Sequence, residues 1–367
     1  MTDESICRLA LGYVPQIGSF HARTLVSHFG NAADIFKAKK SQLEKIEGIG
    51  SARAKSIVDF TDFSLAEKEY GFIKKYKIEA LFLTDNNYPR RLLNCCDPPT
   101  VLYYRGNADL NCSKTVAIVG TRANSDYGKQ VTEKLIKELS ELSILIVSGL
   151  AFGIDAIAHK SALKYNLGTV GVLAHGMDSI YPSEHASIAK EIVYAGGLLT
   201  EFCSGTKPDK HHFPTRNRIV AGMSDAVVVV ETSIRGGSII TAELANGYNR
   251  DVFAFPGKTT DSKSAGCNYL IKSNKAILIT DAKQLIEAMG WEENQKPKDK
   301  RQKELFVELS NDEKIIMELL KQNKSAHIDE LNQKSGLSSS TVAAAILNLE
   351  LKNMITSLPG KMYSLDI

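Results

Sequence analysis

The chain has 367 residues, of which 43% are hydrophobic and 24% charged, and its formal net charge is +3 at pH 7. This length predicts more than one domain, and this composition is typical of a soluble globular protein with a real core. The small net charge excludes a uniformly basic protein, so any nucleic-acid surface has to be local. No apolar run reaches transmembrane length, and the polar, acidic first residues are not a secretory signal.

The cysteines and histidines favour a reduced cytoplasmic protein without a metal. No C-x-x-C pair occurs among the six cysteines, which are Cys7, Cys95, Cys96, Cys112, Cys203 and Cys267. We expect them to act as small, buried apolar groups in a reducing compartment. The histidines are scattered apart from the pair His211 and His212, so no spacing supports a metal site.

An internal repeat lies near the beginning of the chain. "IGSFHARTLVSHF" at 17–29 and "IGSARAKSIVDF" at 49–60 share Ile-Gly-Ser followed by helix-spaced apolar residues. The repeat predicts an all-helical domain over residues 1–70, of the SAM or helix-hairpin-helix kind. In a helix-hairpin-helix motif, backbone N–H groups face a DNA phosphate. Contact with DNA and simple packing of two helical pairs both remain open.

Residues 71–114 are predicted to form a connector with one extra strand. The strand is "IEALFL" at 78–83, and the following "NNYPRRLLNCCDPPTVLYYRGN" is rich in turn residues.

From residue 115 the pattern changes to alternating strands and helices. Seven short apolar runs lack polar alternation, as expected of strands buried on both faces: "TVAIVG", "SILIVSG", "TVGVLAHG", "GLLTEF", "DAVVVVET", "DVFAFPG" and "KAILIT". Amphipathic helical stretches separate them. The alternation predicts an α/β domain over 115–290 with a Rossmann-like, doubly wound, mostly parallel sheet.

The last part of the chain is predicted to be a linker and a small domain. Residues 291–310 begin with a highly charged stretch that contains few apolar residues, which is typical of a linker. Residues 311–367 predict three helices and a hairpin with Pro359-Gly360 at its turn, the pattern of a winged helix. The presumed recognition helix, Ser339 to Lys352, has few basic residues, which favours protein interaction or weak DNA contact over groove reading.

The loops that follow the strands carry the candidate ligand groups, because open parallel sheets bind ligands beyond the carboxyl ends of their strands. The first loop, "GTRANSDYG", lacks the dinucleotide fingerprint but offers Gly120 for close backbone approach and Arg122 as a cation. The second loop, "SGLAFGID", offers Ser148, Gly149 and Gly153, which allow a hydroxyl and backbone N–H groups to face an anion.

A third loop, "ETSIRGGSIITAELA", combines a flexible turn with a helix N-terminus. Gly236, Gly237 and Ser238 are predicted to begin the helix, with Arg235 beside them. One helix N-terminus stabilises an anion by only ~0.3–1 kcal/mol, so several such loops have to act together. Their coincidence on one sheet predicts an anion or phosphate site.

The stretch "HHFPTRNRIVAG" at 211–222 predicts a helix beginning around 215–217 with Thr215 as its N-cap. Arg216 and Arg218 then lie in the first turn, where cations oppose the helix dipole unless an anion offsets the cost. The competing interpretation is salt bridges to Glu201, Glu231 or Asp225.

Taken together, these segments resemble one family, DNA-processing protein A (DprA, also called Smf) of bacterial transformation. The resemblance rests on "YPRRLL", "DPPTVLYYRGN", "VAIVGTR", "SGLAFGIDAIAH", "YPSEH", "FPTRNRIVAG", "GGSIITAELA", "RDVFAFPG" and "GCNYLI". It implies a cytoplasmic homodimer without enzymatic activity that binds single-stranded DNA. It also implies loading of the recombinase RecA onto incoming strands during natural transformation and recombination.

The resemblance also implies which residues line the DNA pocket: Arg122, the "SGLAFGID" loop, the "RNR" residues Arg216, Asn217 and Arg218, and Gly236, Gly237 and Ser238. Two positions depart from the family pattern. Phe152 stands where Arg is common, which removes a phosphate contact but offers a face for base stacking. His185 follows "YPSE" where the family usually has Asn, and Lys190 is the expected substitute cation.

Two other functions are considered. Rossmann-like nucleotide phosphoribohydrolases of the lysine-decarboxylase-like group have a Gly-Gly turn followed by Glu, which makes Glu243 a candidate acid. Their full glycine-rich spacing is absent, so we expect neither a catalytic residue nor a cofactor. The third hypothesis is an adaptor, in which the winged helix and the dimer surface hold partners and DNA contact is secondary. The helices around 238–248 and 281–290 are candidate dimer surfaces.

Overall fold

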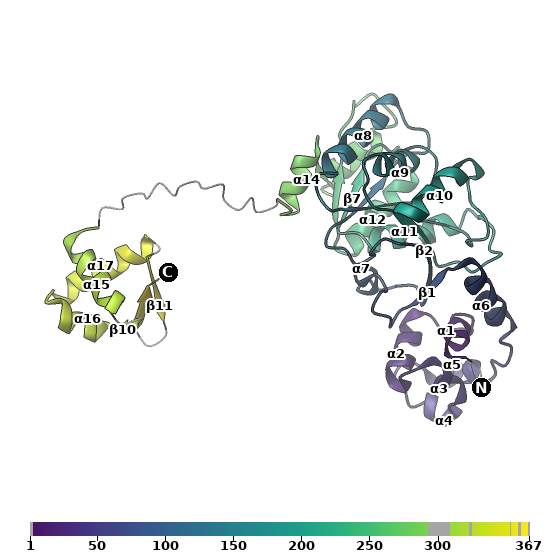
Figure 1. Cartoon of the computed structure of the whole chain (residues 1–367), viewed down its shortest axis with the longest axis horizontal. Helices are drawn as coiled ribbons and strands as arrows, with labels where there is room; N and C mark the ends of the chain where they lie inside the picture. The colour runs from purple at the N-terminus through teal and green to yellow at the C-terminus, as the bar shows by residue number, and fades with distance from the viewer. Residues whose placement is uncertain (1–2, 293–308, 323–324, 353, 359–360, 366–367) are drawn as a thin grey trace. The chain divides into compact units, whose positions relative to one another are not determined.

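A computed structural model describes residues 3–292, 309–322, 325–352, 354–358 and 361–365. The chain divides into two compact units, Met1–Trp291 and Glu292–Ile367 (Figure 1). Each unit has its own hydrophobic core. Within the described ranges, no helix combines the length and hydropathy needed to cross a membrane.

Within the described residues, six helices precede the sheet and confirm the predicted helical domain. They are α1 Glu4–Leu11, α2 Ser19–Phe29, α3 Ala32–Lys37, α4 Lys40–Leu43, α5 Gly50–Val58 and α6 Ser64–Tyr76. The repeat places Gly18 as the N-cap of α2 and Gly50 as the first residue of α5. Both helices bury their apolar positions in one core, which is why the repeated spacing predicted them correctly.

The two repeated turns have different surroundings. Gly12, Tyr13 and Ile17 of the first turn line a cavity of about 420 Å³ together with residues 97–101 and 201 of the sheet domain. In the second turn Gly48 and Gly50 are exposed and have positive φ, 81° and 58°. The first copy therefore packs against the sheet domain, while the second remains open to solvent.

The sheet has nine strands among the described residues, in the order β1-β2-β6-β5-β4-β3-β7-β8-β9. The strands are β1 Glu79–Phe82, β2 Val101–Gly106, β3 Thr115–Val119, β4 Leu145–Ser148, β5 Thr169–Val172, β6 Gly196–Thr200, β7 Ala226–Val229, β8 Asp251–Ala254 and β9 Ile277–Leu278. The seven strands from β6 to β9 are parallel, and β2 and β1 add antiparallel pairs. The predicted mostly parallel α/β fold is confirmed.

Helices cover both faces of the sheet because successive strand residues point to opposite sides. In β3, Val116 and Ile118 pack with α8 Asp126–Leu139, α9 Ile154–Lys164 and α14 Ala282–Ala288. Ala117 and Val119 pack in the other core, with α11 His212–Gly222, α12 Gly237–Gly247 and α13 Ala265–Lys272. A smaller cluster holds α10 Ala186–Ala195. Burial on both sides explains the apolar runs of β3 to β8, whereas for "KAILIT" the prediction was wrong, because the edge strand β9 is exposed.

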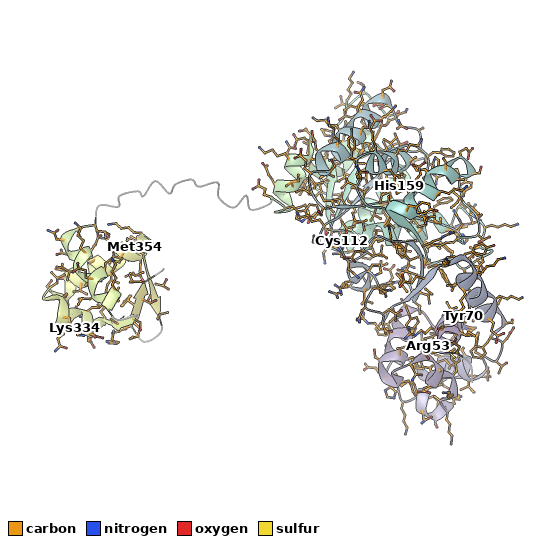
Figure 2. The ribbon with its side chains drawn as sticks, viewed as in Figure 1. Arg53, Tyr70, Cys112, His159, Lys334 and Met354 are labelled. Atoms are coloured by element: carbon orange, nitrogen blue, oxygen red, sulfur yellow. The ribbon has the colours of Figure 1, made fainter. Side chains whose placement is uncertain are left out.

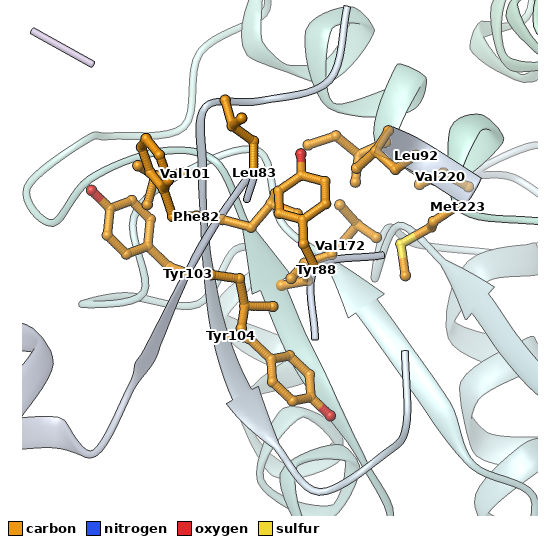
Figure 3. Packing of buried hydrophobic residues seen from close by; sticks show 14 of the residues in the cluster. Phe82, Leu83, Tyr88, Leu92, Val101, Tyr103, Tyr104, Val172, Val220 and Met223 are labelled. Atoms are coloured by element: carbon orange, nitrogen blue, oxygen red, sulfur yellow. The ribbon is translucent and has the colours of Figure 1, made fainter. Parts of the chain in front are cut away.

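The connector is part of the sheet domain. The prediction gave it one strand, but β2 is a second, and it joins β1 to β6. The short helix α7 Arg90–Leu93 and the buried Tyr88 pack with Val220 of α11 and with Met223, the C-cap of α11 (Figure 3). Turn residues on both sides of "VLYYRG" hid the strand, whose four leading residues are all buried.

The second unit has the winged-helix pattern. Its described elements are α15 Asn311–Gln322, β10 Ser325–His327, α16 Ile328–Ser335, α17 Ser339–Leu351, β11 Ile355–Leu358 and β12 Met362–Leu365. The strands pair in the order β10-β12-β11, and β10 is too short to have been predicted. The Ser338 hydroxyl caps α17 by accepting from the Thr341 N–H (3.2 Å). Pro359-Gly360 and most of the predicted linker lie outside the described residues.

Candidate functional site

A cavity of about 640 Å³ lies at the carboxyl ends of β3, β4 and β7, against the first turns of α11 and α12. The strand order reverses there, because β3 has β4 on one side and β7 on the other. This is the position at which open parallel sheets bind ligands. Eight of the fourteen predicted site residues line the cavity: Gly120, Arg122, Gly149, Arg216, Asn217, Gly236, Gly237 and Ser238.

The other six predicted residues lie outside this cavity. Lys190 on α10 and Arg235 before α12 are exposed. The buried Ser148 hydroxyl donates to a backbone carbonyl of β3 (2.6 Å), so the sheet satisfies it. Gly153 has a φ of 75°, and a Cβ there would lie 2.2 Å from the Thr121 carbonyl oxygen. This glycine therefore allows two loops to pack closely.

Phe152 borders a smaller neighbouring pocket of about 20 Å³ with Arg122, Tyr181 and Phe213. Its side chain is 43% exposed and packs edge-on against His185, with ring centroids 5.0 Å apart. The aromatic face is thus accessible beside the main cavity, and its stacking on a base remains a prediction.

Arg122 is an exposed cation of the cavity. Its guanidinium lies over the Phe213 ring, 4.7 Å from the centroid, and Phe213 in turn packs near Tyr181 with ring centroids 6.0 Å apart. It forms no ion pair with any carboxylate in the described part of the chain. A free cation next to two aromatic rings suits a phosphate and its attached base.

Arg216 is the buried cation of the cavity, with only 4% of its surface exposed. Its Nη1 donates to the Val172 carbonyl (2.7 Å), and its guanidinium fills the space where a Cβ on Gly149 would be. Burial lowers the pKa of Arg216 to about 10, although the nearby Asp155 opposes this shift. The side chain therefore stays protonated at neutral pH.

The Asp155 carboxylate accepts hydrogen bonds from backbone N–H groups that the prediction assigned to a ligand. Its Oδ2 accepts from the N–H groups of Gly149 (3.1 Å) and Ala151 (3.4 Å). Burial raises the pKa of this carboxyl, while Arg216 acts in the opposite direction. The second loop is therefore held by its own carboxylate, and these two N–H groups do not face the cavity as free donors.

Arg218 does not reach the cavity with Arg216. It forms an ion pair with Glu201 and donates to the Asp97 carbonyl, beside the separate 420 Å³ cavity. Burial raises the pKa of Glu201, and Arg218 offsets part of that rise. For Arg218, the structure shows the salt bridge that the competing interpretation anticipated.

Helix α11 begins earlier than predicted, at His212, with His211 as its N-cap. The Asp209 side chain accepts from the His211 N–H (2.8 Å) and starts the turn. The Thr215 hydroxyl instead donates to the His211 carbonyl (3.0 Å), so Thr215 is not the N-cap. Arg216 is consequently the fifth residue of the helix, where opposition to the helix dipole is weaker.

Helix α12 begins beside the cavity without a side-chain cap. The N–H groups of Gly237 and Ser238 meet no acceptor in the described residues. Ser238 is 6% exposed, and its buried Oγ likewise has no described partner. This helix start therefore holds unused donors that line the cavity.

Glu231 is a buried residue that the sequence argument did not assign to the site. Its Oε2 accepts from the Ser125 N–H (2.8 Å) and its carbonyl accepts from the Thr121 N–H (2.7 Å). It thereby holds the loop that carries Arg122. Its position directly after an apolar strand was the available signal, because such a carboxylate needs nearby donors.

Among the described residues, the groups that the enzyme and metal hypotheses would need are not gathered at the cavity. Glu243, the candidate acid, pairs with Lys275 (2.8 Å) and does not line the cavity. His212 stacks near Phe202, with ring centroids 4.4 Å apart. In the described ranges, no three His, Cys, Asp or Glu side chains are grouped to hold a metal.

Three sequence profiles match the chain. DNA recombination-mediator protein A matches residues 79–290, a DprA winged helix domain matches 302–361, and a helix-hairpin-helix motif matches 7–66. Protein Smf of Synechocystis sp. is 32% identical across 97% of this chain and 97% of its own length. DNA processing protein DprA of Streptococcus pneumoniae is 36% identical across 69% of this chain and 96% of its own.

Solved structures agree with these matches. The X-ray structure of DNA processing protein A from S. pneumoniae has a TM-score of 0.65 and 32% identity, covering 78% of this chain and 98% of that one. A structure of DNA processing protein A from Helicobacter pylori, solved for its single-stranded DNA binding mode, has a TM-score of 0.53 and 32% identity. It covers 59% of this chain and 96% of that one.

Proposed function

This chain belongs to the DNA recombination-mediator protein A family, and on that premise we propose that it binds single-stranded DNA in the 640 Å³ cavity. One observation carries the proposal: Arg122 is exposed and without a described carboxylate partner, over Phe213 and near Tyr181. Cations for phosphates and aromatic faces for bases are the two requirements of sequence-independent strand binding. The similar protein from H. pylori, whose structure was solved for its single-stranded DNA binding mode, supports the choice of ligand.

We also propose that the bound strand is passed to the recombinase RecA in the cytoplasm, during DNA uptake and recombination. The family description as a recombination mediator supports this step. The candidate acid Glu243 lies outside the cavity, which favours a binding protein over a nucleotide-cleaving enzyme.

A homodimer through the β9 edge of the sheet is part of the proposal. Ile277 and Leu278 of this edge strand are 50% and 46% exposed, and Tyr269 is 40% exposed. An exposed apolar edge strand is a template for pairing with another chain. Of the two predicted surfaces, α12 has its exposed Ile240 in the lining of the 640 Å³ cavity, and α14 buries Leu285 in the core.

Salt-titrated binding of single- and double-stranded oligonucleotides of equal length tests the proposed function. We expect tighter binding of the single strand, with log affinity falling against log salt by about 0.7 per phosphate neutralised. Equal affinity for both forms, or affinity that does not change with salt, would contradict the proposal.

A further inference from the structure

The cations that line the 640 Å³ cavity are few enough to suit one phosphate group rather than a row of phosphates. Three cations, Arg122, Lys210 and Arg216, stand against two carboxylates, Asp155 and Asp209, which leaves one net positive charge. A groove that follows several phosphates needs a row of cations. The other predicted cations Lys190, Arg218 and Arg235 lie outside the cavity.

The α12 end of the cavity has the donors that a phosphate requires. Helix α12 has 11 residues, and its Gly237 and Ser238 N–H groups have no described acceptor. Ser238 is more than nine-tenths buried, and its Oγ is also without a described partner. The buried Nε of Arg216 also has no described hydrogen-bond partner. A helix N-terminus with an unused hydroxyl and a buried cation is a phosphate site.

The lining also has aromatic groups suited to a base. Tyr181 is 46% exposed, and its ring lies near that of Phe213. Arg122, over Phe213, adds a planar cation on which a base also stacks. The lining therefore combines phosphate donors with one stacking platform.

We infer that this cavity is a one-nucleotide site and that it binds a free deoxynucleoside 5′-monophosphate. The phosphate lies at Gly237 and Ser238, and the base lies against Tyr181. The Asp155 carboxylate accepts from two N–H groups and interacts with the Arg216 guanidinium, which compensates its charge beside the phosphate. The inference rests on the proposed function, since the same nucleotide site would hold one unit of the strand. Free nucleotides then compete with the strand.

Competition with wild-type protein tests this inference. A labelled single strand is bound, and deoxythymidine monophosphate, thymidine or inorganic phosphate is added at constant ionic strength. We expect the monophosphate to displace the strand at concentrations at least roughly tenfold below those of thymidine or inorganic phosphate. Only the monophosphate contacts both the phosphate donors and the aromatic rings.

Ser238→Ala provides the matched variant. Loss of a hydrogen bond to a charged group should weaken competition by the monophosphate roughly tenfold. Ser273→Ala removes a hydroxyl that bonds within its own helix and should change nothing. Strand binding without competition by the monophosphate, or competition no better than that of inorganic phosphate, would overturn the inference and leave the proposed function standing. Absence of strand binding would instead reject the proposed function.

Discussion

Arg216 and Arg218 are two residues apart on α11, and an α-helix directs such side chains toward nearly opposite sides. Arg216 consequently lies at the cavity, and Arg218 lies at the Glu201 ion pair. Of the two arginines in "TRNR", one thus lines the cavity and the other has a structural role. Substitution of Arg218 should therefore affect stability, whereas substitution of a cation in the cavity, such as Arg122, should affect strand binding.

Arg122→Ala should weaken single-strand binding by roughly tenfold or more, because it removes a free cation from the cavity. Its thermal stability should stay that of the wild type, since no described carboxylate pairs with the side chain. Binding titrations and thermal unfolding measure both effects. Lys160→Ala, an exposed lysine on α9, is the control and should alter neither.

Arg218→Ala should lower the free energy of unfolding by about 2 kcal/mol, because it leaves a largely buried Glu201 carboxylate without its partner. Denaturant unfolding measures this loss. Affinity for the single strand, measured below the unfolding temperature, should stay within about twofold of wild type. A tenfold loss of affinity with unchanged stability would place Arg218 in the binding site after all.

At the scale of elements, helix α9 joins the site to the sheet. Asp155 near its start holds the Gly149 loop, and one turn later lies His159, which is labelled in Figure 2. His159 is completely buried. The His159 Nδ1 shares a hydrogen bond with the Thr169 hydroxyl of β5 (2.7 Å). Burial lowers the pKa of His159 from 6.5 to about 3, so the folded protein keeps this ring neutral.

Acidification should destabilise the fold through His159. The unfolded chain takes up a proton below pH 6.5 while the folded chain resists it down to about pH 3. Stability is therefore fully present above pH 6.5 and falls as the pH drops through this window, by up to about 1.4 kcal/mol per pH unit. Urea unfolding at several pH values should show a shallower dependence for His159→Gln, whatever its stability at neutral pH. His28→Gln, at an exposed histidine, should retain the wild-type slope; equal slopes for all three proteins would contradict the assignment.

At the scale of the whole molecule, the two units have separate cores and different surfaces. Helix α17, in the position of a recognition helix, has no Arg or Lys, and its Leu347 and Leu351 are 56% and 74% exposed. A groove-reading helix would present basic side chains there. The second unit is therefore better suited to a protein partner than to specific duplex reading.

Removal of residues 292–367 should leave the first unit folded, because its core lies within Met1–Trp291. Single-strand affinity should change by less than about twofold, since the cavity is complete without the second unit. Circular dichroism and strand titration check these two outcomes. Loss of recombinase loading with intact strand binding would favour the adaptor hypothesis, whereas loss of strand binding would show that the cavity alone is insufficient.

The periodicity of apolar residues by itself predicts most of the fold. Burial on both faces explains the continuous apolar runs of the parallel strands β3 to β8, whereas the edge strand β9 is exposed. The repeat around Gly18 and Gly50 predicted the two helical hairpins. Strand β2 was missed because neighbouring turn residues dominate its local pattern. The very short β10 was missed because three residues carry no periodicity.

The loops were located from the sequence, because in a parallel sheet they must lie at one edge. Which of their groups are free was decided only by the tertiary structure. Asp155 accepts hydrogen bonds from two N–H groups, and Glu201 forms an ion pair with Arg218. The Ser238 hydroxyl has no described partner. The physical reason is that periodicity is a local property of the chain, whereas the partner of a charge or a donor comes from residues distant in sequence. Residue types therefore predicted an anion site, and packing decided which of the predicted cations line the cavity.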